Sequence, residues 1–120
     1  MKISFLLHFY QPHNQQADIL DRIVNESYRP LVNGFLENPN FKVMVNISGA
    51  LTQLLHEKGY EDVIDGFSEL SERGQIEFTG SAMYHAFLPL IPEEEIIRQI
   101  KQNEEANRKL LGESYQPKGF

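Results

Sequence analysis

A dense group of polar and aromatic side chains follows the first apolar run of the sequence. The run Ile3–Leu7 leads directly into His8, Tyr10, Gln11 and His13. Imidazole, phenol and amide groups donate and accept hydrogen bonds, and imidazole also changes its charge near neutral pH. The residue types therefore indicate a polar ligand site at the end of a buried segment.

Two later apolar runs end in the same way. The side chains in and after them are Asn46, Ser48, Glu77, Thr79, Ser81, Tyr84 and His85. Because sites in parallel α/β folds form at the carboxyl ends of the strands, we expect these groups to gather at one end of a sheet. Aromatic rings among amides and a carboxylate suit a carbohydrate, whose C–H faces stack on rings while its hydroxyls form hydrogen bonds.

Glu77 is the carboxylate of this set. Side chains of a strand alternate, so Ile76 and Phe78 share one face while Glu77 and Thr79 share the other. Two interpretations remain open. Either Glu77 lies on an inner face and pairs with a histidine or a sugar hydroxyl, because an unpaired buried charge is very costly, or it is hydrated in an edge strand.

The histidines are not spaced like metal ligands. His8 and His13 are five residues apart, His56 precedes EKG in what we interpret as a surface position, and no HxxxH or HxH pair occurs. The chain has no cysteine, which excludes disulfides, thiolate metal sites and a cysteine nucleophile. We expect no metal and no cofactor.

Composition limits the partners. The chain has 120 residues, 41% hydrophobic and 23% charged, which is typical of one small globular domain or part of a larger one. The net charge is −6, and the 11 basic residues form no stripe, so we expect neither nucleic acid nor a membrane as a partner. No signal peptide or membrane-spanning run is evident, and we predict a cytoplasmic location.

Apolar periodicity predicts a β-α-β-α-β-α order. The predicted strands are Lys2–Phe9, Phe41–Ile47 and Ile76–Thr79, and the predicted helices are 18–38 with a kink at Pro30, Ala50–His56, Glu61–Arg73 and 92–112. Strands separated by helices indicate right-handed crossovers and a parallel sheet. The tail SYQPKGF is typical of the approach to a fourth strand.

The last helix has the clearest limits. Acidic residues fill its first turn and basic residues its last, which matches the helix dipole at both ends. Its predicted inward face is Ile96, Ile97, Ile100, Leu110 and Leu111. Asn103 and Asn107 fall near that face, and the sequence gives them no role.

Three stretches, taken in order, resemble conserved regions of one enzyme family. They are HFYQP at His8–Pro12, GQIEFTGSAMYHAFLPLIP at Gly74–Pro92 and QPKGF at Gln116–Phe120. The family is glycoside hydrolase family 57, retaining enzymes of α-glucans that include amylases, 4-α-glucanotransferases and branching enzymes. ESYRPL and VNISGAL also resemble connecting segments of this family, so the resemblance covers the whole chain.

This resemblance implies that residues 1–120 are the N-terminal portion of an incomplete (β/α)7 barrel acting on an α-glucan. It places both the nucleophilic glutamate and the acid/base aspartate beyond residue 120, so no catalytic residue is expected in this chain. The implied substrate-binding residues are His8, Tyr10, Gln11, Glu77, Tyr84 and His85. Tyr10 stands where many relatives have histidine, and Ala86 stands where proline is common.

Two alternatives stay open at this point. A polysaccharide deacetylase-like barrel would need an aspartate and two histidines as metal ligands, a set that the sequence does not display. A stand-alone, non-catalytic carbohydrate-binding or interaction module needs no catalytic carboxylates. Because open sheet edges are templates for pairing, we also expect the chain alone to self-associate.

Overall fold

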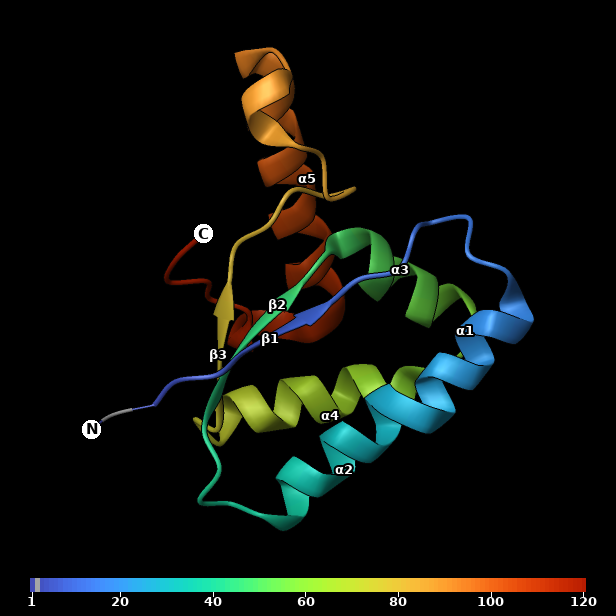
Figure 1. Cartoon of the computed structure of the whole chain (residues 1–120), viewed down its shortest axis with the longest axis vertical. Coiled ribbons are helices and arrows are strands. Elements are labelled where there is room, and N and C mark those ends of the chain that lie inside the picture. Colours follow the sequence, from blue (N-terminus) through green and yellow to red (C-terminus); the bar gives the residue numbers. More distant parts are fainter. Residues whose placement is uncertain (2) are drawn as a thin grey trace.

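Three parallel strands form the sheet that positions the polar groups (Figure 1). The computed structural model describes residue 1 and residues 3–120. The strands are β1 (Leu6–Phe9), β2 (Val43–Ile47) and β3 (Ile76–Thr79), arranged in the order β1-β2-β3. The parallel sheet and the bounds of β3 are confirmed.

The first two strands begin later than the sequence predicts. Lys2, the predicted start of the first strand, lies outside the described residues. β2 begins at Val43 and not at Phe41, because its pairing with β3 begins where Val43 stands opposite Ile76. Phe41 and Lys42 precede that pair, and both are exposed.

Helices connect the strands as the periodicity predicts. Between β1 and β2 lie α1 (Ala17–Ile23), the π-helical turn η1 (Val24–Tyr28) and α2 (Arg29–Glu37); between β2 and β3 lie α3 (Gly49–Glu57) and α4 (Glu61–Glu72); after β3 come η2 (Leu88–Leu90), α5 (Glu93–Leu111) and η3 (Gly112–Ser114). In Figure 1, α1, α2 and α4 run together along one side of the sheet, and α5 stands across them.

The predicted interruption at Pro30 takes the form of a π-helical turn. Proline lacks an N–H, and its ring clashes with the carbonyl one turn back in a regular helix. Here the helix widens over Val24–Tyr28, and the Arg29 N–H bonds to the Val24 oxygen, five residues back. Pro30 then lies in the first turn of α2, where its missing donor costs little.

The two faces of the sheet differ in kind. One face packs against the helices and carries the apolar core: Leu7, Phe9, Val43, Val45, Ile47, Ile76 and Phe78. The other face, which we call the open face, carries Leu6, His8, Met44, Asn46, Glu77 and Thr79, all exposed or half-buried. The alternation predicted for Ile76–Thr79 is therefore confirmed.

The inward face of α5 agrees with the prediction only in part, because Leu111 is buried and Leu110 packs on the core while much of the rest is polar. Ile97, predicted to be inward, is 46% exposed. The buried residues are Gln99, Asn103, Ala106, Asn107 and Leu111. The reason is that α5 lies against the start of α3, where backbone N–H groups of a helix need acceptors.

The two asparagines without a predicted role supply these contacts. Asn103 Oδ1 accepts the Gly49 N–H at 2.7 Å, and its Nδ2 donates to the Tyr115 hydroxyl at 3.1 Å. Asn107 Oδ1 accepts the Thr52 hydroxyl at 2.6 Å, and its Nδ2 donates to the Ile47 carbonyl at 3.2 Å. Both asparagines have no exposed surface, so amide hydrogen bonds join α5 to α3.

The tail runs along the outer edge of β3 without forming an assigned strand. The Lys118 N–H donates to the Phe78 carbonyl at 3.2 Å, and the Gly80 N–H donates to the Gly119 carbonyl at 2.6 Å. A Cβ atom at Gly80 would lie 2.9 Å from the Phe120 ring and 3.2 Å from the Gly119 oxygen. Gly80 thus permits the close approach of the tail.

Candidate functional site

A row of three hydrogen-bonded side chains crosses the open face at the carboxyl ends of the strands. His8, Asn46 and Thr79 stand opposite one another in the strand register. His8 Nδ1 lies 2.8 Å from Asn46 Oδ1, and Asn46 Nδ2 donates to Thr79 Oγ1 and to the Gly80 carbonyl, each at 2.8 Å. This His8–Asn46–Thr79 row ties all three strands together.

Two further rings gather around His8. His85 Nε2 lies 2.9 Å from His8 Nε2, and the two rings meet edge to face with centroids 4.7 Å apart. The Tyr10 ring lies 4.9 Å from that of His85 and is nearly parallel to that of His8 at 6.3 Å. The structure therefore brings three of the predicted site residues together from β1 and from the loop after β3.

The backbone of His85 is unusual. Its φ is +56°, in the left-handed region, where a non-glycine residue costs on the order of 1 kcal/mol or more. Its N–H donates to the Ala82 carbonyl at 3.2 Å. This tight turn directs the imidazole back toward His8, a placement that the spacing of the sequence does not reveal.

Tyr84 lies beside a different histidine. Its ring centroid is 5.7 Å from that of His13, its N–H donates to Gln99 Oε1 at 3.1 Å, and its side chain is exposed. Tyr84 and His13 thus form a second, more exposed ring pair that joins the loop after β3 to the loop after β1. A sugar contact at Tyr84 remains a prediction.

Gln11 does not join the three rings of His8, Tyr10 and His85, which we call the ring group. Its Nε2 donates to the Tyr28 hydroxyl at 3.2 Å, and that hydroxyl donates to the Tyr10 carbonyl at 3.4 Å. Burial raises the pKa of Tyr28, and the hydrogen bond from Gln11 opposes that rise. Gln11 therefore fastens the end of β1 to the first helical segment. Its predicted contact with substrate is not tested by these distances.

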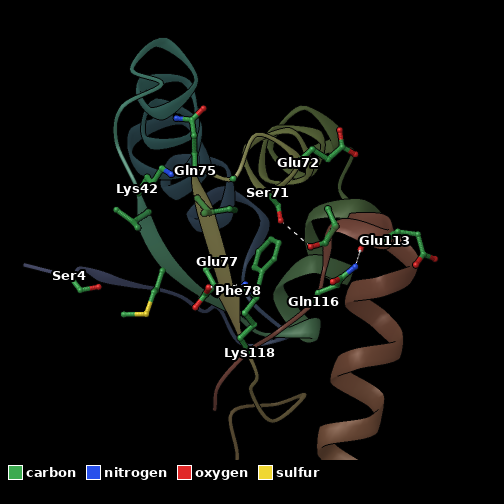
Figure 2. Close-up of a pocket in the computed structure, with 15 residues that line it drawn as sticks. Ser4, Lys42, Ser71, Glu72, Gln75, Glu77, Phe78, Glu113, Gln116 and Lys118 are labelled. Atoms are coloured by element: carbon green, nitrogen blue, oxygen red, sulfur yellow. Dashed lines mark hydrogen bonds and ion pairs between the residues drawn. The ribbon is translucent and has the colours of Figure 1, made fainter.

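Glu77 lies on the open face, one register row before Asn46. Its side chain is 49% exposed, and its Oε2 lies 3.3 Å from Lys118 Nζ. Both side chains are labelled in Figure 2. Of the two interpretations left open, the structure supports a hydrated carboxylate, here with a lysine partner from the tail. Any contact of Glu77 with a sugar or a histidine stays a prediction.

A hollow of about 830 Å³ lies at the other end of the sheet (Figure 2). Its walls include Ser4, Lys42 and Gln75, which precede the three strands, together with the end of α4 and the tail. The ion pair of Glu77 and Lys118 also lines this hollow, so Glu77 borders it as well as the open face. Sites in parallel α/β folds lie at the carboxyl ends of strands and not at the amino ends. We therefore assign the candidate site to the ring group and not to this hollow.

The site offers imidazole nitrogens but no recognisable metal ligand set. Within residue 1 and residues 3–120, no group of three or more histidine, aspartate or glutamate side chains is placed to hold a metal ion. His8 and His85 meet as a pair without a third such ligand.

The described helices include none long and apolar enough to cross a membrane.

The sequence prediction of site residues missed two members of the row. Asn46 and Thr79 are among the polar groups expected at the strand ends, but not among the implied substrate-binding residues. The available signal was the alternation in VMVNI, which places the Asn46 amide opposite the core face of a strand that otherwise exposes only Met44 there. An amide on the middle strand reaches both neighbours.

The fold defines a parallel α/β protein, with a candidate site at the carboxyl ends of its strands. Residues 5–120 match the sequence model of glycosyl hydrolase family 57, and the chain belongs to that family. The resemblance inferred from the three motif stretches is thus confirmed.

Relatives and a solved structure agree with this assignment. The chain is 35% identical to alpha-amylase 1 of Dictyoglomus thermophilum over 99 residues, which is 82% of the chain and 14% of that protein. It is 34% identical to an alpha-amylase of Pyrococcus horikoshii over 121 residues, which is 99% of the chain and 18% of that protein. It matches the crystal structure of 4-alpha-glucanotransferase from Thermococcus litoralis with a TM-score of 0.81 and 33% identity, covering 88% of the chain and 17% of that structure.

These matches confirm the fold class and show how much of its relatives the chain covers. The chain spans 14 to 18% of the length of the relatives named above. The parallel β-α-β-α-β-α segment is consistent with the first part of an incomplete (β/α)7 barrel, as the resemblance implies.

Proposed function

We propose that residues 1–120 are the N-terminal portion of the catalytic barrel of a retaining α-glucan hydrolase or glucanotransferase, and that they contribute substrate-binding residues. The ring group of His8, Tyr10 and His85 at the carboxyl ends of the strands carries this proposal. Family membership supports it, as do the names of the relatives, which are amylases and 4-α-glucanotransferases.

Each ring has a chemical task in this proposal. Tyr10 offers an aromatic face to the C–H face of a glucose unit, while the imidazoles of His8 and His85 form hydrogen bonds to its hydroxyls. Tyr84 and His13 extend the aromatic surface toward the next unit. The site needs neither a metal nor a cofactor for these contacts.

Catalysis requires more than this site contains. Retaining hydrolysis uses two carboxylates roughly 5–5.5 Å apart. The carboxylate that the strands bring to the open face is Glu77, which is paired with Lys118. We assign Glu77 a substrate-orienting or nucleophile-supporting role and not that of nucleophile.

The chain alone should bind a malto-oligosaccharide without turning it over. Maltoheptaose binding is measured by calorimetry, and turnover is assayed with maltoheptaose and an aryl α-maltoside. His8→Ala and Tyr10→Ala should each weaken binding by roughly tenfold, the equivalent of one lost hydrogen bond or stacking contact. His56→Ala is the control, because His56 is exposed, pairs with Glu61 and is not a member of the proposed site.

Two results would oppose the proposal. One is the absence of binding to the wild-type chain. The other is turnover that survives purification and disappears in Glu77→Gln, which would show that this chain holds its own catalytic carboxylates.

In the whole protein, Glu77→Gln separates three roles. A group that stabilises the charge of the transition state should lower kcat by roughly ten- to a thousandfold with little change in KM. A contact made equally in the ground state should raise KM alone. Unchanged kcat and KM would remove Glu77 from the proposed site.

We also infer that the 120-residue chain self-associates when it is alone. The free edge of the sheet exposes three large apolar side chains, those of Ile3 and Phe5 just before β1 and of Leu6 at its start. A concentration-independent monomer in light scattering would contradict this inference.

We also propose that the protein is located in the cytoplasm and binds neither nucleic acid nor a membrane.

A further inference from the structure

We propose that Asn46 is a positioning residue that fixes the hydrogen on Nδ1 of His8, so that Nε2 of His8 faces the site as a hydrogen-bond acceptor. This inference rests on the proposed function for the identity of the ligand, an α-glucan hydroxyl. The arrangement of hydrogens itself follows from the contacts of a neutral His8 imidazole.

The orientation of the Asn46 amide is determined by its neighbours. The Gly80 carbonyl, 2.8 Å from Nδ2, has no hydrogen to donate, so the Asn46 atom that faces it must be the NH₂ group. The second hydrogen of that NH₂ group points to Thr79 Oγ1, also at 2.8 Å. The side-chain oxygen of Asn46 is then the atom that faces His8.

That oxygen assigns the hydrogen of the imidazole. An amide oxygen only accepts, so His8 Nδ1, at 2.8 Å, must carry the hydrogen. A neutral imidazole has a single N–H, so Nε2 of His8 keeps its lone pair. Nε2 of His8 is therefore a hydrogen-bond acceptor, and Asn46 on the neighbouring strand β2 fixes it in that state.

The partner of that lone pair in the free site is His85. The two Nε2 atoms are 2.9 Å apart, which requires one hydrogen between them, and with His8 as acceptor it belongs to His85. A ligand hydroxyl that displaces His85 must likewise donate its hydrogen to His8 Nε2. The Tyr10 ring, 6.3 Å away and nearly parallel to that of His8, lies beside this position.

Asn46 thereby selects the chemistry of the ligand. With the hydrogen on Nδ1, the site favours a group that donates at Nε2, such as a glucose hydroxyl beside the C–H face that stacks on Tyr10. With the hydrogen moved to Nε2, the same imidazole would favour an acceptor such as a carboxylate. A neutral hexose chain thus fits this site better than an acidic sugar.

The test reads the hydrogen positions directly. The chain is labelled with ¹⁵N-histidine, and its four histidines are studied by magic-angle-spinning NMR, which tolerates self-association. The wild-type His8 should show a protonated Nδ1 and an unprotonated Nε2. Asn46→Leu should abolish that preference and weaken maltoheptaose binding by roughly tenfold, the equivalent of one hydrogen bond. Thr79→Val is the matched control, because it removes the other partner of the amide but keeps Gly80, and it should retain the Nδ1 hydrogen.

The outcomes separate the inference from the proposed function. A hydrogen on Nε2 in the wild type, or an unchanged His8 pattern in Asn46→Leu, overturns the role of Asn46. An Nδ1 hydrogen that depends on Asn46, in a chain that binds no maltoheptaose, supports the positioning role and overturns the glucan assignment. Tighter binding of an acidic oligosaccharide than of maltoheptaose overturns the selection of a hydroxyl donor.

Discussion

Replacing Asn103 by alanine should be among the most damaging single changes in this chain. Its side chain is fully buried and makes two hydrogen bonds, one to the Gly49 N–H and one to the Tyr115 hydroxyl. A buried donor left without a partner costs about 1–3 kcal/mol, and loss of the second bond adds about 1 kcal/mol. The free energy of unfolding should therefore fall by about 2–4 kcal/mol.

Urea unfolding followed by far-UV circular dichroism measures this loss. With a slope of about 2 kcal/mol per molar urea, the midpoint should move down by about 1–2 M. Lys101→Ala is the control on the same helix, because Lys101 is exposed, and it should stay within about 0.5 kcal/mol of the wild type. Hydrogen exchange gives a local readout: the Gly49 amide should lose protection in Asn103→Ala and keep it in the control.

The contact is assigned wrongly if Asn103→Ala unfolds like the wild type while the Gly49 amide remains protected. That result would mean that another acceptor satisfies the start of α3. A fall in stability with Gly49 still protected would place the loss at Tyr115, whose ring is buried against that of Phe78.

Further predictions concern the helices. Gly66→Ala should lower the free energy of unfolding by about 1–3 kcal/mol, because its Cβ would overlap Val32 Cγ1, and adding Val32→Ala should restore much of that loss in thermal melts. Gly34→Ala in α2 meets open space and should instead raise the free energy of unfolding by about 0.5–1 kcal/mol. The hydrogen bonds from Arg98 and then Gln99 lower the pKa of Glu95 from 4.5 to about 2. The ionised Glu95 carboxylate accepts these hydrogen bonds, so they should be fully present above pH 4.5, persist at pH 4 and be lost as the pH falls through 2. An NMR titration of the Glu95 carboxyl checks this, and Arg98→Ala should return its pKa toward 4.5.

Local patterns in the sequence were enough to predict the architecture. Continuous apolar runs gave the three parallel strands, and the alternation around Glu77 placed that residue on the face opposite the core. Charges at the two ends of α5 marked its limits. These features depend on neighbours in the chain, so the sequence contains their cause.

Contacts between distant segments could not be predicted in this way. Its isoleucines make an apolar inward face the natural prediction for α5. The buried side nevertheless includes two asparagines, because it faces the polar start of α3. The meeting of His8 with His85 depends on a left-handed turn at a non-glycine residue, which no propensity predicts. Asn46 became a site residue only when the register placed it between His8 and Thr79.

The order of the strands has a consequence for how the protein is made. In this sheet each strand pairs with the one that precedes it in the chain, and the tail approaches the edge of β3, the most recent strand. A nascent chain leaving the ribosome therefore never has to wait for a later segment before pairing the strands already released. Each β-α unit pairs with the edge left by the previous one, so the three strand ends of the site can be assembled in the order of synthesis, with the loop that carries His85 added last.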